Sequence, residues 1–385
     1  MADPQHIAKL REGVDAWNRW RESNWNVKPD LSGLDLPNEK GIKSSALWDK
    51  ETRQLNLDNI NFGWTNLTGA NLRGISLEEA ILEEANLVTA NLQSVSLSGA
   101  KLHAALLANA NLFEASIIRA DLSTANLSGA DLRFAHLSGA NLEQTDLSGA
   151  DLRSAQMGAT NLQGANLKDA DLWVANLNGA DLTDANLENT NLIRTSLHST
   201  NLTRANLYNA DLRDADLQAA NLEYAGLIGI TYERRFMRGK YQGIRGVESS
   251  YGDAIFRRDA LDQDYIDTMT SRWRRSPMIV VLWLWSLIDY GRSLSRIIWI
   301  AALLVIAFGF IYAVQPSAVI YASPFQNWFT PYYSSLITFT SLGFSDDVIA
   351  QNGLGQVLLT MEVLLGYFVL GILISILLQK ISRRS

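Results

Sequence analysis

Cysteine is absent from this 385-residue chain. Its absence excludes a disulfide framework, a thiolate nucleophile and a cysteine zinc site. Histidine is also rare, and the four copies are so scattered that we expect each to be a solvated surface residue rather than a ligand. They are His6, His103, His136 and His198. No other catalytic or metal-binding cluster emerges, so we expect a protein that is not an enzyme and carries no cofactor.

Lysine and arginine are absent from residues 297 to 379. This window holds two apolar runs, about 297–314 and 354–378, and a membrane-spanning helix takes about 20 apolar residues. Basic residues flank the window on both sides, and such residues stay on the cytoplasmic side of a membrane. They are Arg292, Arg296, Lys380, Arg383 and Arg384. The sequence therefore predicts an integral membrane protein of the cell inner or plasma membrane, with both termini cytoplasmic.

A half-apolar segment, residues 332–347, lies between the two runs and is too short to cross a bilayer. Irregular backbone at membrane depth is tolerated only where protein buries it or where it lines a water-filled path. Thr330 can cap a short helix and Pro331 can open it. We therefore expect a pore helix and a re-entrant pore loop, with an ordinary extracytoplasmic loop as the alternative.

The stretch TFTSLGFSD, residues 338–346, resembles the TxTTVGYGD signature of potassium channels. In that family, backbone carbonyls of the filter replace the water shell of the ion. The resemblance implies a permeant monovalent cation, expected to be potassium, with a serine in place of the family's second glycine. The implied filter residues are Thr340, Ser341, Leu342, Gly343, Phe344, Ser345 and Asp346.

The second apolar run contains Glu362, Gly366 and Gly371. Since no cationic side chain exists in the window, Glu362 must be hydrated, be protonated or accept hydrogen bonds from hydroxyls such as those of Thr338 or Thr360. We interpret it as filter support, with a direct ion site as the alternative. The two glycines are either gating hinges or close-packing contacts.

A bulky apolar residue, almost always leucine, recurs at every fifth position from Leu57 to Leu227. A small residue stands two places before each of these apolar residues, and the residue between them is usually Asn or Asp. A period of five fits neither an α-helix nor a flat strand, so the chain must turn once per repeat. Such short units can bury their leucines only by stacking on one another. This pattern resembles the pentapeptide-repeat family. The resemblance implies an all-β, right-handed quadrilateral β-helix with four repeats per coil and with leucine and alanine pointing inward.

The rest of the chain is organised around these two regions. The opening residues have no uninterrupted apolar core and are not a signal peptide; Ile7, Leu10, Val14 and Trp17 instead indicate a helix that, with one early repeat, seals the end of the β-helix. A partner surface formed by the N-terminal tryptophans is the alternative. The expected domains are 1–54 helix and cap, 55–228 β-helix, 229–276 coupling linker or tether, 277–293 interfacial helix, and 294–385 α-helical pore domain with two transmembrane helices.

The repeat segment, residues 55–228, has nine basic and 20 acidic side chains, a net charge of −11. Some pentapeptide-repeat proteins mimic DNA and inhibit topoisomerases, but acidic side chains also keep a repeat surface soluble, and we expect no nucleic-acid partner. One pore loop cannot enclose a pore, whereas four identical copies in a closed ring can. We expect a homotetrameric cation channel in membrane lipid whose cytoplasmic repeat domain regulates gating or binds a protein. The alternative is a membrane-anchored scaffold that conducts nothing.

Ser345 is predicted to set the ion selectivity. A non-glycine residue with positive φ costs roughly 1–2 kcal/mol, and about 1.4 kcal/mol separates a tenfold preference from none. We therefore expect Ser345→Gly to sharpen the discrimination of potassium from sodium, measured as a reversal potential under bi-ionic conditions. A parent that is already strongly selective and a reversal potential unmoved by Ser345→Gly would contradict this role.

Overall fold

The computed structural model describes residues 2–51, 54–233, 240–273, 276–278, 294–321, 326–340 and 348–382. The chain divides into two compact units, Met1–Met269 and Thr270–Ser385. Each is described by itself. The expected filter residues 341–346 and most of the expected interfacial helix, from residue 279 to 293, lie outside the described residues.

The first unit begins with two short helices, α1 (Pro4–Arg11) and α2 (Val14–Ser23). The Asp3 carboxylate accepts a hydrogen bond of 2.7 Å from the backbone N–H of Gln5, which is the capping contact expected at a helix start. One helix was expected here, but Gly13 takes a φ of 106° and separates the two.

Trp17 of α2 attaches this pair of helices to the repeats. Its side chain is fully buried, and its ring meets that of Phe62 edge to face with the ring centroids 5.5 Å apart. Its indole N–H donates a hydrogen bond of 2.7 Å to the carbonyl of Asn61. The helix α2 thus packs against the first regular coil of the repeats. Shorter elements follow before the regular repeats: η1 (Leu36–Asn38), η2 (Ile42–Ser44), and the antiparallel strands β1 (Trp48–Asp49) and β2 (Gln54–Leu55).

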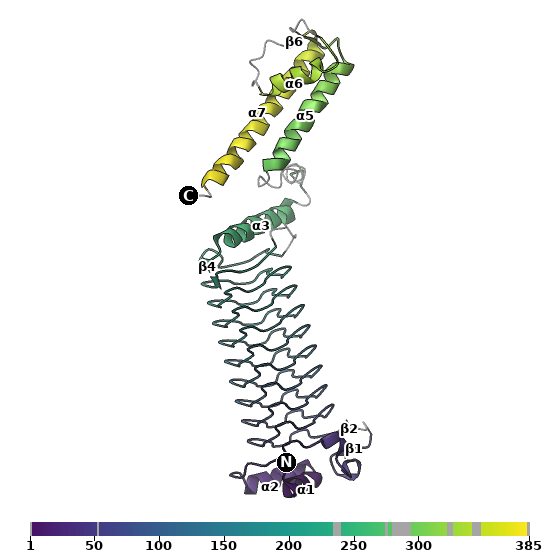
Figure 1. Cartoon of the computed structure of the whole chain (residues 1–385), viewed down its shortest axis with the longest axis vertical. Coiled ribbons are helices and arrows are strands. Elements are labelled where there is room, and N and C mark those ends of the chain that lie inside the picture. Colours follow the sequence, from purple (N-terminus) through teal and green to yellow (C-terminus); the bar gives the residue numbers. More distant parts are fainter. Residues whose placement is uncertain are drawn as a thin grey trace. The chain divides into compact units, whose positions relative to one another are not determined.

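The repeats form a stack of coils, which we call the rod (Figure 1). Parallel β-bridges join residues 20 positions apart, as from Asn71 to Asn91 and from Asn91 to Asn111, so each coil holds four pentapeptides. The repeating leucines and alanines are buried in one continuous core. The sequence-based expectation of a four-sided β-helix with inward leucines is confirmed.

Threonine replaces the inward alanine at several positions, and its hydroxyl is hydrogen-bonded to a core carbonyl at all of them except Thr65, which has no partner among the described residues. The Thr145 hydroxyl donates to the carbonyl of Leu122 at 2.8 Å, and the Thr195 hydroxyl donates to that of Leu172 at 2.8 Å. A buried hydroxyl costs free energy unless it is hydrogen-bonded. These bonds explain why the core tolerates a polar side chain at the small position.

Each pentapeptide turns at the second residue after its leucine, where the backbone has a positive φ. Glycine occupies some of these positions, but residues such as Asn59 and Trp64 also adopt φ between 53° and 60°. The left-handed conformation costs roughly 1–2 kcal/mol for a non-glycine residue. Core burial and the bonds between coils must therefore offset a repeated backbone cost.

The coil pairing continues beyond the repeat segment recognised in the sequence. Asn221 pairs with Arg245, and β3 (Gly226–Leu227) pairs in parallel with β4 (Tyr251–Gly252). The helix α3 (Ala254–Trp273) follows, and its Phe256 and Ala260 join the buried core of the rod. Part of the expected linker 229–276 is thus a further coil, and α3 covers the C-terminal end of the stack, as Figure 1 shows.

After α3, the described residues of the second unit form three helices and a two-stranded ribbon. The helices are α5 (Leu294–Val314), α6 (Thr330–Thr340) and α7 (Gly353–Ser382), and α6 contacts both of the others. The strands β5 (Val319–Tyr321) and β6 (Val348–Ala350) pair antiparallel. Two helical segments, Leu294–Val314 and Gly353–Leu378, are long and apolar enough to cross a membrane.

Leu127→Arg is predicted to destabilise the rod by several kcal/mol, because it places an unpaired charge in the fully buried leucine ladder. Thermal unfolding followed by circular dichroism measures the effect. Gln163→Arg is the matched control, since it adds the same charge at an exposed position of the rod. Equal melting of Leu127→Arg and the parent would contradict the inward orientation of Leu127.

Candidate functional site

The short helix α6 begins at a reciprocal cap. The backbone N–H of Phe329 donates to the Asn327 side-chain oxygen at 2.9 Å, and the backbone N–H of Asn327 donates to the Thr330 hydroxyl at 2.8 Å. Thr330, expected as the cap, is therefore the first helical residue and shares the capping role with Asn327. Pro331 follows in the first turn, where its missing N–H costs no helical hydrogen bond.

Two glycines let α6 approach its neighbours closely. A Cβ at Gly309 of α5 would lie 2.6 Å from a ring carbon of Tyr332, near the start of α6. A Cβ at Gly366 of α7 would lie 2.5 Å from the carbonyl oxygen of Phe339, near its end. Gly366 lies about 20 Å along α7 from its first residue, at ~1.5 Å per residue. The helix α6 thus starts beside the last turns of α5 and ends beside the middle of the apolar part of α7.

Gly371 is different from Gly366. Beyond the adjacent residues and backbone of its own helix, no atom of the described residues lies within 4 Å of a Cβ placed at Gly371. The two glycines, expected to serve either as hinges or as packing contacts, therefore have unequal surroundings. Gly366 is a close-packing contact in this structure, and Gly371 faces open space within the chain.

Glu362 is the centre of a buried polar cluster. Its exposed fraction is 0%, although it lies on the apolar helix α7. One carboxylate oxygen accepts a hydrogen bond of 2.5 Å from the Tyr312 hydroxyl of α5, and the other accepts one from the Ser335 hydroxyl of α6. The Ser335 hydroxyl also lies 2.9 Å from the carbonyl oxygen of Val305. One carboxylate therefore joins three helices.

The donors proposed from the sequence were the wrong ones. The Thr360 hydroxyl donates to the carbonyl of Gln356 at 2.7 Å, one turn back on its own helix. Thr338 is buried, and its hydroxyl has no hydrogen-bond partner among the described residues. A signal for Tyr312 was present, because it carries the only hydroxyl in the run 297–314. Ser335 could not be identified without knowing which face of α6 meets α7.

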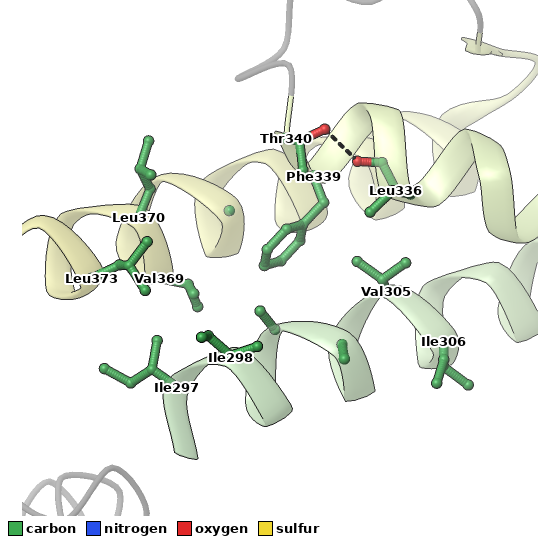
Figure 2. Close-up of a pocket in the computed structure, with 13 residues that line it drawn as sticks. Ile297, Ile298, Val305, Ile306, Leu336, Phe339, Thr340, Val369, Leu370 and Leu373 are labelled. Carbon is green, nitrogen blue, oxygen red and sulfur yellow. Dashed lines mark hydrogen bonds between the residues drawn. The ribbon is translucent and has the colours of Figure 1, made fainter. Parts of the chain in front are cut away.

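An apolar cavity of about 500 Å³ opens between α5, α7 and the end of α6. Figure 2 shows Phe339 of α6 pointing into the space between the other two helices, with Ile298 on one side and Val369 on the other. Thr340, the last residue of α6, donates its hydroxyl to the carbonyl of Leu336 at 2.7 Å. The cavity wall offers almost no polar group, so an apolar occupant suits it.

The repeat segment matches a known family. The family model described as pentapeptide repeats matches eight copies over residues 56–93, 90–129, 125–169, 160–198 and 195–229. This match ends before α3 and both apolar helices. A search of functionally curated proteins gives no match.

Solved structures similar to this chain include two pentapeptide repeat proteins and one antibiotic resistance protein. HetL of the cyanobacterium Nostoc, involved in heterocyst differentiation, is 30% identical over 51% of this chain and 81% of its own, with a TM-score of 0.34. A protein of the Arabidopsis thaliana thylakoid lumen is 31% identical over 27% of this chain and 68% of its own, with a TM-score of 0.18. QnrB1, a plasmid-mediated fluoroquinolone resistance protein, is 17% identical over 47% of this chain and 90% of its own, with a TM-score of 0.27. TM-scores this low carry no information about function.

Gly366→Ala is predicted to destabilise the second unit, because the new methyl group would overlap the carbonyl of Phe339. The expected cost is about 1–3 kcal/mol, measured as a lower melting temperature of the detergent-solubilised chain. Gly371→Ala is the matched control on the same helix and should melt like the parent, since its surroundings are open. An equal decrease of the melting temperature in both variants would show that helix flexibility, and not the contact of Gly366 with α6, determines the stability of the second unit.

Proposed function

We propose that this chain, which belongs to the pentapeptide repeat family through residues 56–229, is one subunit of a homotetrameric cation channel. In this proposal α5 and α7 span the membrane, α6 is the pore helix, and the rod is a cytoplasmic domain that binds a protein or regulates gating. The permeant ion is potassium. The observation that carries the proposal is the attachment of the short helix α6 to both apolar helices through buried Glu362.

The length and placement of α6 support a re-entrant segment. Its 11 residues extend about 16 Å, roughly half of the ~30 Å hydrocarbon core of a bilayer. It ends against Gly366, midway along the apolar part of α7. A helix that ends at this depth directs the negative end of its dipole toward the membrane interior, and this favours a cation there.

Glu362 is suited to positioning α6 rather than to binding the ion. Both of its carboxylate oxygens already accept hydrogen bonds from hydroxyls on other helices. A fully buried carboxylate is costly unless such donors satisfy it, so its position constrains α5, α6 and α7 together. We assign it the role of filter support, with Tyr312 and Ser335 as its partners.

The ion pathway itself is assigned from the sequence. Ser341, Leu342, Gly343, Phe344 and Ser345 would supply the carbonyls, after Thr340 and before Asp346. Asp346, Asp347 and Glu362 are the only charged residues from 297 to 379. Four copies would therefore surround the pore with acidic groups only, which favours cations over anions.

A membrane-anchored scaffold is the second candidate. The family match covers the rod alone, and two apolar helices could hold a rod at a membrane without conducting. Repetition of short units creates long surfaces suited to binding other macromolecules. The two candidates differ in one measurable property, the passage of ions.

We predict that the purified full-length chain is a tetramer by native mass spectrometry and passes potassium in a liposome flux assay. Asp346→Lys should reduce the flux, because it places four positive charges at the proposed outer mouth. Glu83→Lys makes the same change of charge at an exposed position of the rod and should leave the flux unchanged. A monomeric or dimeric mass, or liposomes without flux, would favour the scaffold.

A further inference from the structure

The apolar cavity of the second unit, about 500 Å³ in volume, extends along two helices, and we call it the slot. Each helix contributes one face to it. On α7 the lining residues recur every three or four positions from Gly366 to Leu373. On α5 they come in pairs one turn apart, which are Ile297 with Ile298, Ala301 with Ala302, and Val305 with Ile306.

The length of the slot is close to that of one leaflet of a bilayer. From Ile297 to Ile306 the backbone of α5 rises about 13 Å at ~1.5 Å per residue, and half of the hydrocarbon core measures ~15 Å. One end of the slot lies beside Arg296, the last basic residue before the apolar run. The other end is closed by the last turn of α6, which contributes Leu336, Phe339 and Thr340.

The slot is apolar and is open on one side. Thr340 is the only polar side chain among the described residues that line it, and its hydroxyl already donates to the carbonyl of Leu336 at 2.7 Å. Ile298 and Ile306 line the slot but are 54% and 55% exposed, so the slot opens on their side. Water inside would lack hydrogen-bond partners, and an empty slot would deprive its lining atoms of van der Waals contacts.

We propose that the slot holds one hydrocarbon chain of a membrane lipid, with the methyl end of the chain against Phe339. The Phe339 ring points into the slot, as Figure 2 shows. Membrane-spanning helices and lipid chains both run across the bilayer, so a chain can enter sideways past Ile298 and Ile306 without crossing water. This inference rests on the membrane placement of α5 and α7 in the proposed function and does not depend on ion conduction. It extends that function, because the bound chain would contact the pore helix α6.

A second copy of the chain fits the slot less well. One of its side chains would enter across the helices and fill about one turn, ~5.4 Å, whereas the slot follows α5 for about 2.5 turns. One of its helices, ~10–12 Å in diameter, would have to separate α5 from α7, which contact each other. A hydrocarbon chain is long and narrow and has no polar group to satisfy.

The test uses the full-length chain in phosphatidylcholine nanodiscs in which a small fraction of the lipid carries a photoactivatable diazirine at the methyl end of one chain. Mass spectrometry locates the labelled residues after illumination. We expect an adduct on Phe339, which is only 7% exposed and lies inside the slot. A lipid with its diazirine beside the ester should label Ile298 and not Phe339, since the two ends of the slot lie about 13 Å apart.

Ala302→Trp should reduce the Phe339 adduct about tenfold, equivalent to about 1.4 kcal/mol of affinity, because the new side chain fills the slot. Ala307→Trp is the matched control, since it makes the same change on the same helix at an exposed position outside the slot. It should leave the adduct unchanged. Ala302→Leu fills less of the slot and should reduce the adduct in part, and it replaces Ala302→Trp if that variant melts below the parent.

Labelling of Phe339 by both lipids alike, by neither lipid, or equally in the two tryptophan variants would overturn the proposal. Absence of the Phe339 adduct together with loss of the oligomer in Ala302→Trp would assign the slot to a second copy instead. A chain that stays soluble without lipid or detergent would refute the membrane placement itself. Absence of ion flux in a parent that is labelled at Phe339 would count against the channel only.

Discussion

Stacking of one coil on the next is the constraint on which the rod depends. A pentapeptide offers one large apolar side chain and has no neighbour of its own to bury it. Only the coil 20 residues away supplies that neighbour, together with the backbone partner of each bridge. The left-handed turn residues add a cost at every corner. The coils are therefore stable as a stack with both ends covered, and α2 and α3 provide these covers.

The same stacking determines how the surface can vary. Any side chain that recurs once per coil becomes a line along the rod. Where the line is asparagine, amides bond from coil to coil, as Asn91 does to Asn71 at 3.1 Å. Where it is aspartate, as at residues 131, 151 and 171, like charges would face one another, and Arg133 and Arg153 lie between them. The side chains along such a line can thus change without altering the buried core.

The sequence predicted what depends on period and composition. The burial of the repeating leucines and the two apolar helices follow from residue type and spacing, whereas the coil of four repeats follows from the resemblance to the pentapeptide-repeat family. The coil that contains Arg245 and Tyr251 could not be predicted, because the sequence after Leu227 does not follow the five-residue pattern. These residues are placed by their backbone pairing with the last regular coil, which the sequence does not reveal. The break at Gly13 was also missed, because helical periodicity continues across it.

The candidate site was predictable in its residue types but not in its contacts. The absence of lysine and arginine from the window left hydration, protonation or hydroxyl donors as the ways to satisfy Glu362, and in the structure hydroxyls bind it. The identity of these hydroxyls depends on which faces of α5 and α6 meet α7. Sequence spacing does not show this, since Tyr312 is 50 residues and Ser335 is 27 residues away from Glu362. An apolar side chain at position 362 would pack equally well in several rotations of α7. A carboxylate with donors on two other helices is satisfied in only one, so a single polar residue gives the apolar helices a defined arrangement.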